Sequence, residues 1–187
     1  FALARHGTAE ARILAGMTEV SKQRLLLATR NAGKTREVRE ILGAGWEVED
    51  LTVRRDLPEV EETGETFEEN ARLKALAGAA HDNGWVLADD SGLEVDALGG
   101  APGVRSARFA GEDADMAVNR ALLLEKLGEV RGEGRRGRFR CVLALAKNGV
   151  VVRTFSGAVE GFIAAAERGA GGFGYDPLFV PEGSCRT

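Results

Sequence analysis

The segment Leu25-Leu26-Leu27-Ala28-Thr29-Arg30-Asn31-Ala32-Gly33-Lys34 decides the fold class of this 187-residue chain. Its apolar first half predicts a buried strand over Leu25–Thr29, and the residues after Asn31 predict a helix over Ala32–Leu42. A short loop between a strand and a helix is typical of α/β proteins. Because a helix N-terminus offers free N–H groups and the positive end of a dipole, this loop is suited to bind phosphate.

The side chains of this loop allow more than one interpretation. Asn31 can cap the helix, Gly33 lets the backbone approach a ligand, and Lys34 adds a cation. The simplest alternative is a capped helix start with a solvated lysine. A second alternative is a P-loop phosphotransferase, with Ala28 replacing the first Walker glycine and Trp85–Asp89 as the acidic strand.

Two features of the chain speak against the P-loop. Thr29 and Arg30 stand where that motif has a long glycine-rich loop, and hairpins predicted in the second half fit poorly with an all-parallel sheet.

The remaining elements predict an α/β domain with a mixed sheet. A capping box at Thr66–Glu69 opens a helix to about His81, and Asn148-Gly149 turns a hairpin. The expected strands are Trp46–Val53, Trp85–Ala88, Leu93–Leu98, Arg138–Ala146, Val150–Val159 and Leu178–Val180, with a further helix over Asp113–Leu127.

Two consecutive acids follow the buried run Trp85–Ala88. Because adjacent strand residues point to opposite faces, only one of Asp89 and Asp90 is expected to face a given site, unless the chain has already turned. A carboxylate there is a suitable ligand for Mg²⁺. The alternative is an ordinary turn over Asp89–Gly92, since these residue types favour turns.

A second acidic stretch, Glu61-Glu62-Thr63-Gly64-Glu65, follows Asp56-Leu57-Pro58-Glu59. Most of these acids are expected to be solvated, although one of them could complete a metal site. In the next helix Asn70 and Lys74 lie four residues apart and so share a face, where Lys74 can meet phosphate or an acid.

Glycines surround two aromatics and an acid in Gly171-Gly172-Phe173-Gly174-Tyr175-Asp176. Glycines permit close approach, and an aromatic ring in such a loop can stack on a base. Asp176 can accept hydrogen bonds from ring N–H groups or anchor the loop through its own backbone. The alternative is a wide turn whose aromatics belong to the core.

Together these segments resemble the non-canonical purine nucleoside triphosphate pyrophosphatase family, also called the Ham1 or inosine triphosphatase family. The resemblance covers about Arg24–Thr187, in family order and spacing. The stretches that carry it are Thr29–Lys34, Glu62–Ala75, Ala88–Leu93, Gly99–Gly103 and Gly172–Pro177.

The resemblance implies hydrolysis of ITP, dITP and XTP to the monophosphate and pyrophosphate with Mg²⁺. It also implies a homodimer and an elongated mixed sheet with flanking helices, in two lobes around a central cleft. Asp90 would be the catalytic acid–base and a metal ligand, and Glu59 the other metal carboxylate. The substrate-binding residues it implies are Thr29, Arg30, Asn31, Ala32, Gly33, Lys34, Lys74, Ser91, Phe173, Gly174, Tyr175 and Asp176.

The composition of the whole chain limits the classes of partner that we expect. A net charge of −4 disfavours a nucleic-acid surface, no apolar run is long enough to span a bilayer, and two cysteines without a metal-ligand spacing fit a reducing cytoplasm. Residues 1–23 match nothing in the family and are expected to be an extension. The family's terminal lysine and Ser-His-Arg motif are not found before Thr187, so we expect a C-terminally truncated domain over residues 24–187, in which binding without turnover is an alternative.

Overall fold

A six-stranded mixed sheet in the order β2-β1-β3-β4-β5-β6 forms the frame of the protein. The computed structural model describes residues 22–55, 57, 60–169 and 172–187. The strands are β1 (Gln23–Leu27), β2 (Trp46–Asp50), β3 (Trp85–Val95), β4 (Arg136–Lys147), β5 (Val150–Ile163) and β6 (Phe179–Pro181). The α-helices are α2 (Ala32–Leu42), α3 (Phe67–Ala79) and α4 (Met116–Leu127), and the 3₁₀ turns are η1 (Gly43–Gly45), η2 (Asp96–Leu98), η3 (Gly103–Arg108) and η4 (Gly132–Arg135).

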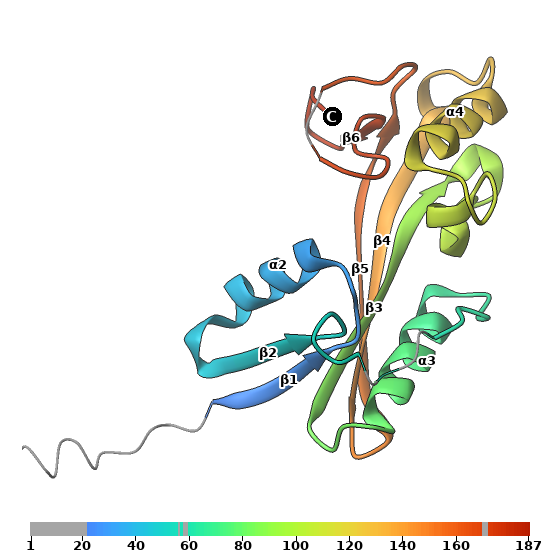
Figure 1. Cartoon of the computed structure of the whole chain (residues 1–187). Helices are drawn as coiled ribbons and strands as arrows, with labels where there is room; N and C mark the ends of the chain where they lie inside the picture. Colours follow the sequence, from blue (N-terminus) through green and yellow to red (C-terminus); the bar gives the residue numbers. More distant parts are fainter. Residues whose placement is uncertain (1–21, 56, 58–59, 170–171) are drawn as a thin grey trace, which may run out of the picture.

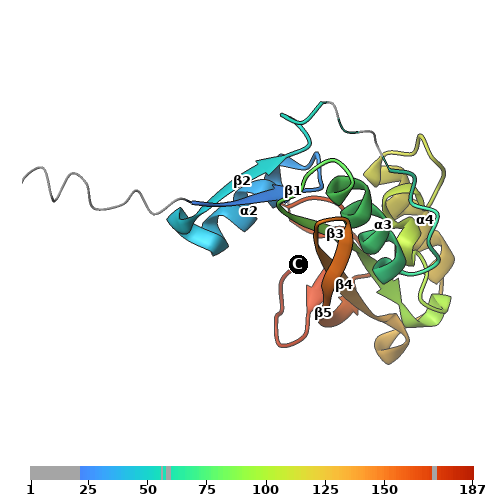
Figure 2. The ribbon, with the colours of Figure 1, turned by 90° about the horizontal axis from the view of Figure 1, so that it is seen from below.

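The long strands β3, β4 and β5 run through two lobes, as Figure 1 shows. One lobe holds β1, β2, α2 and α3, and the other holds α4, β6 and the segment after β5. Viewed from below in Figure 2, α3 lies against β3 and β4, whereas α2 lies with β1 and β2. This arrangement confirms the predicted α/β class, the elongated mixed sheet and the two lobes.

The strand directions disfavour the P-loop alternative. β1 pairs in parallel with β2 and β3, but β3, β4, β5 and β6 pair antiparallel to one another. A P-loop protein needs a parallel sheet with crossover helices between its strands. No helix of the described residues is long and apolar enough to cross a membrane.

Local sequence signals act as predicted at three places. The Asn31 side chain accepts hydrogen bonds from the N–H groups of Gly33 and Lys34. Thr66 and Glu69 form a complete capping box at the start of α3. Asn148 and Gly149 both have positive φ, 51° and 76°, as the tight turn between β4 and β5 requires.

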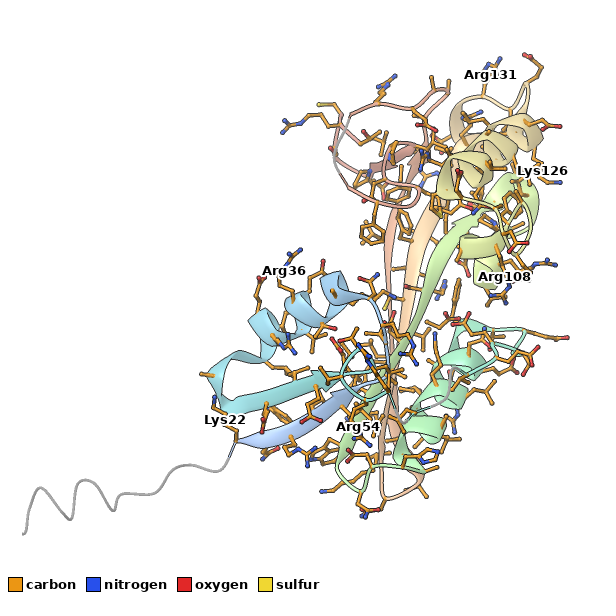
Figure 3. All side chains as sticks on the ribbon, viewed as in Figure 1. Lys22, Arg36, Arg54, Arg108, Lys126 and Arg131 are labelled. Atoms are coloured by element: carbon orange, nitrogen blue, oxygen red, sulfur yellow. The ribbon has the colours of Figure 1, made fainter. Side chains whose placement is uncertain are left out.

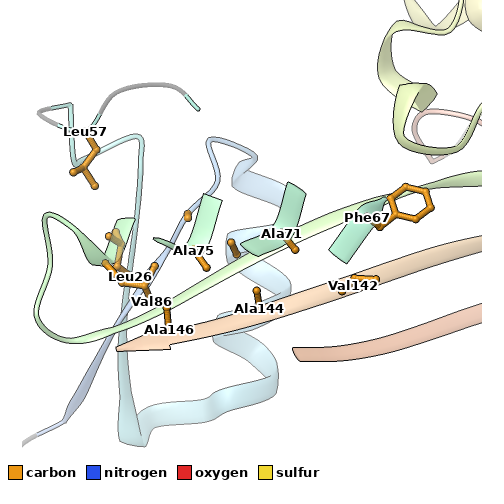
Figure 4. Close-up of a cluster of buried hydrophobic side chains, with 12 residues drawn as sticks. Leu26, Leu57, Phe67, Ala71, Ala75, Val86, Val142, Ala144 and Ala146 are labelled. Atoms are coloured by element: carbon orange, nitrogen blue, oxygen red, sulfur yellow. The ribbon is translucent and has the colours of Figure 1, made fainter. Parts of the chain in front are cut away.

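Small side chains bring α3 close to the sheet. Ala71 and Ala75 of the helix pack onto Val86, Ala144 and Ala146 of the strands, and all five are fully buried (Figure 4). A separate cluster in the other lobe joins α4 to β3 and the last strands, through Leu93, Val95, Leu123, Leu127, Ile163, Tyr175, Leu178 and Phe179.

The prediction of two strands over Trp85–Ala88 and Leu93–Leu98 is wrong. β3 is one strand of 11 residues, paired with β4 from Trp85↔Lys147 to Val95↔Gly137. The turn-favouring residues Asp89–Gly92 stay extended because a full ladder to β4 holds them. Other predicted bounds differ by up to a few residues; for example, α4 begins at Met116 after its cap Asp115.

Candidate active site

The middle of β3 lies at an open edge of the sheet, between the lobes. β1 pairs with β3 only as far as Leu87, so no strand in the described part of the chain covers Asp89, Asp90 and Ser91 on that side. Asp89 contacts a lysine of α2, while Asp90 contacts residues of α3. Both acids nevertheless line the same cleft, because they sit at this uncovered edge. The expectation that only one acid faces the site is therefore wrong.

Asp90 is buried and held by two residues of α3. Asn70 Nδ2 donates to its Oδ2 at 3.2 Å, and Lys74 Nζ lies 3.2 Å from its Oδ1. This confirms that Asn70 and Lys74 share a face. Burial, aided by the charge of Glu62, raises the pKa of Asp90 above its ordinary value despite the opposing effect of Lys74.

Glu62 completes a charged cluster that the sequence did not single out. Lys74 Nζ lies 2.7 Å from Glu62 Oε1, so one ammonium bridges the carboxylates of Glu62 and Asp90. Burial lowers the pKa of Lys74, but the bond to Glu62 and the charge of Asp90 raise it above its ordinary value overall. The predicted metal ligand Glu59 lies outside the described residues.

Arg108 of η3 reaches Glu62 from the other side of the cleft, where Figure 3 places it near the gap between the lobes. Its guanidinium lies 3.4 Å from Glu62 Oε2 and donates to the Glu62 backbone carbonyl at 3.3 Å. The sequence signals for Glu62 are the acidic stretch and the family-like stretch Glu62–Ala75, neither of which assigns it a role, and Arg108 carries no signal.

The predicted phosphate loop brings Lys34 to the acids. Its Nζ is ion-paired with Asp89 and donates to Ser91 Oγ at 3.2 Å. Ala32 and Gly33 form the first turn of α2, and Thr29 Oγ1 accepts from the Asn31 N–H at 3.2 Å. The helix N-terminus and a lysine therefore lie beside the open edge of β3.

The Arg30 side chain, unlike that of Lys34, is bonded to backbone carbonyl oxygens. Its guanidinium donates to the carbonyl oxygens of Leu51 and Leu57 at 2.9 and 3.3 Å, so it holds the segment that leads toward Glu62. Its position still lines the cleft, but these bonds give the side chain a supporting role in the structure.

The second glycine loop lies next to the acidic cleft. A neighbouring pocket shares Lys34 and Ser91 with it and adds Phe173, Gly174, Tyr175 and Asp176. Phe173 is 71% exposed at this pocket. Asp176 Oδ2 accepts a hydrogen bond from the Phe173 N–H at 2.9 Å. Of the two roles considered for Asp176, the structure thus shows the one in which it anchors the backbone of its own loop.

Tyr175, in contrast, belongs to the core. It is 2% exposed, and its hydroxyl donates to the Ser106 carbonyl at 2.9 Å. Burial raises its pKa to about 12. Of the two aromatic residues predicted to meet a base, only Phe173 has a free ring.

The Ser106 hydroxyl in turn accepts from the Leu93 N–H at 2.9 Å and donates to the Gly103 carbonyl at 2.6 Å. The segment η3 is thereby fastened to the open edge of β3 and to the glycine loop.

Comparison with known proteins identifies the family. A dITP/XTP pyrophosphatase of Exiguobacterium sibiricum is 54% identical over 158 residues, covering 84% of this chain and 80% of that protein. The dITP/XTP pyrophosphatase of Bacillus subtilis is 48% identical over 163 residues, covering 87% and 82%. The solved structure of the Staphylococcus aureus Ham1 protein superposes with a TM-score of 0.78 at 41% identity, covering 86% of this chain and 82% of that one. Residues 25–187 match the Ham1 family, to which this chain therefore belongs.

Proposed function

We propose that this protein hydrolyses non-canonical purine nucleoside triphosphates (ITP, dITP and XTP) to the monophosphate and pyrophosphate. One observation carries the proposal: two lysines and three carboxylates meet in a cleft that continues into a pocket with an exposed aromatic ring. A cluster of cations suits a triphosphate, and a free ring suits a base. The relatives named dITP/XTP pyrophosphatase support the same activity.

The triphosphate would lie along the N-terminus of α2. The positive end of the helix dipole lies at this N-terminus, with Thr29 and Asn31 at its start. Ala32, Gly33 and Lys34 form the first turn, and phosphate would take over the N–H groups of Gly33 and Lys34 from the Asn31 side chain. Lys34 and Lys74 would exchange their carboxylate partners for phosphate oxygens, and the Ser91 hydroxyl lies within reach of Lys34.

Asp90 would orient the attacking water and take its proton, so that water addition releases pyrophosphate in a single step. Burial suits this acid to the task, because a raised pKa makes the carboxylate a stronger base. Asn70 would keep its bond to Oδ2 and so fix the orientation of the carboxylate when Lys74 moves to phosphate.

Glu62 and Asp90 would hold a divalent cation, which we propose to be Mg²⁺. The ammonium of Lys74 already lies between these two carboxylates, so the position is one that favours a cation. Among the described residues no group of three or more His, Cys, Asp or Glu side chains could hold a metal. Two carboxylates together with water and substrate oxygens are a normal Mg²⁺ environment, in which the ion offsets phosphate charge.

We further propose a cytoplasmic homodimer. Cys141 and Cys185 are both free thiols, in keeping with a reducing compartment. The long strand β5 exposes Val150, Val152, Phe155 and Val159, which suits an interface between copies. Neither nucleic acid nor membrane is among the proposed partners.

Product analysis tests the proposal. With ITP and Mg²⁺, we expect pyrophosphate and IMP in equal amounts. Orthophosphate with a diphosphate would indicate a phosphohydrolase, and ITP binding without any product would leave only a nucleotide-binding module; either result contradicts the proposal.

A further inference from the structure

Arg120 of α4 cross-links the glycine loop that carries Phe173. Its Nε donates to Glu167 Oε1 at 2.8 Å on the arm entering the loop, and its Nη1 donates to the Gly174 carbonyl at 2.8 Å at the tip. The Arg120 side chain is 16% exposed, so water competes little for these bonds. A guanidinium can hold two acceptors in fixed directions at once, which a lysine ammonium on its flexible stem does less well.

The helix that carries Arg120 is itself firmly fixed. Leu123 and Leu127 are fully buried in the core of that lobe. The neighbouring Asn119 is also buried, donating to the Ala107 carbonyl at 3.0 Å and accepting from the Ala110 N–H at 2.7 Å. Arg120 therefore ties the loop to a rigid element.

Among the described residues of the loop, Phe173 and its two flanking glycines have few other restraints. Backbone bonds from Arg168 to Pro177 and from Ala164 to Leu178 close only its neck. Gly172 and Gly174 have positive φ, 78° and 60°, and glycine backbones lose the most freedom when they are ordered. Two side-chain contacts from outside the loop reach the described residues of its tip. Tyr175 fixes the far side, because its ring is buried and its hydroxyl donates to the Ser106 carbonyl, and Arg120 holds the Gly174 carbonyl directly beside Phe173.

We propose that Arg120 is a positioning residue that holds Phe173 ready to stack on the purine base, and so sets substrate affinity without acting on the phosphates. The inference rests on the proposed function, because it assumes that Phe173 meets a base. Stacking is the same in the ground state and in the transition state, so its loss weakens binding while the chemical step is kept.

The test compares Arg120→Met, Arg120→Lys and Glu167→Gln with the wild type. We expect KM for ITP to rise about tenfold in Arg120→Met with kcat within about twofold, and less in the other two variants. Arg131→Met, at an exposed arginine just beyond the end of α4, should change neither value. In a Phe173→Ala background, Arg120→Met should add less than about twofold to KM, because the two residues serve one contact.

Hydrogen exchange gives a second readout that needs no activity. Amides of residues 172–176 should exchange faster in Arg120→Met, while those of α3 and β3 stay unchanged. Four results would each overturn the inference. They are an unchanged KM in Arg120→Met, a fall in its kcat as large as the rise in KM, full additivity of Arg120→Met with Phe173→Ala, and unaltered amide exchange over residues 172–176. If the wild type released no pyrophosphate from ITP, the proposed function would fail, and faster exchange would then show only that Arg120 orders the loop.

Discussion

Asp90 combines a buried carboxylate with two polar partners, and this sets the effect of replacing it. The amide in Asp90→Asn has nearly the same shape but cannot take a proton from water. We expect turnover of ITP to fall about 10²–10⁴-fold, the usual range for a positioned acid–base. Circular dichroism should show an intact fold, and near-normal rates in the folded variant would assign the chemistry to Asp89 or another acid.

The raised pKa of Asp90 also predicts how stability depends on pH. Because the folded state favours the protonated acid, its contribution is full below the ordinary value of 3.8 and is lost as pH rises through the raised value. Asp90→Asn stays neutral throughout. In metal-free buffer, urea unfolding should show the variant gaining stability relative to wild type as pH rises from 4 to 7; a constant difference would contradict the assignment.

Glu62 and Glu61 are neighbours with different surroundings. Glu62 contacts Lys74 and Arg108, whereas Glu61 is exposed. Removing a metal carboxylate weakens cation binding, so Glu62→Gln should raise the Mg²⁺ concentration for half-maximal activity about tenfold or more. Glu61→Gln is the matched control and should not change it. Mn²⁺ binding followed by electron paramagnetic resonance checks the same difference without turnover, and equal behaviour of the two variants would rule out Glu62 as a ligand.

Residue types alone do not predict the contacts of three site residues: Arg30, Tyr175 and Glu62. The resemblance implies that Arg30 and Tyr175 bind substrate, and both line the pockets of the site. Residue types alone do not show that the Arg30 side chain donates to two carbonyl oxygens or that the Tyr175 ring packs in the core. Glu62 was one of several acids in a loop, and only its distance to Lys74 sets it apart.

At the scale of elements, β3 depends on the absence of a side chain at Gly92. A Cβ there would lie 2.6 Å from the Gly103 carbonyl oxygen and would collide with the Ser106 hydroxyl. We expect Gly92→Ala to lower the free energy of unfolding by about 1–3 kcal/mol, as overpacked sites do. Gly45→Ala in η1 meets nothing within 4 Å and is the control. Equal urea midpoints for the two variants would contradict the close packing of η3 on β3.

β3 also shows why some elements could be predicted from the sequence and others could not. Caps and the Asn148-Gly149 turn act locally, so three or four residues were enough to identify them. The continuity of β3 depends on its pairing with β4, about 50 residues away, which no local pattern contains. Tertiary pairing overrode the turn preference of Asp89–Gly92.

At the scale of the whole molecule, the exposed apolar residues of β5 predict self-association. Phe155 and Val159 are 45% and 54% exposed on one face of the strand. If this face joins two copies, Phe155→Glu buries an unpaired charge and should shift the protein toward monomer. Ser156→Glu, an exposed neighbour on the opposite face, is the control. Sedimentation velocity distinguishes the outcomes, and an unchanged sedimentation coefficient in Phe155→Glu would exclude this face as the interface.

The cleft lies between the lobes, and its proposed phosphate-binding and base-binding ends are on different elements. The central claim is therefore that the protein cleaves the bond between the α- and β-phosphates. Hydrolysis of ITP in ¹⁸O-labelled water with Mg²⁺, followed by ³¹P NMR of the products, tests it most directly. The account predicts IMP and pyrophosphate as the first products, in equal amounts, with one ¹⁸O incorporated per turnover. Orthophosphate and IDP as the first products would contradict it.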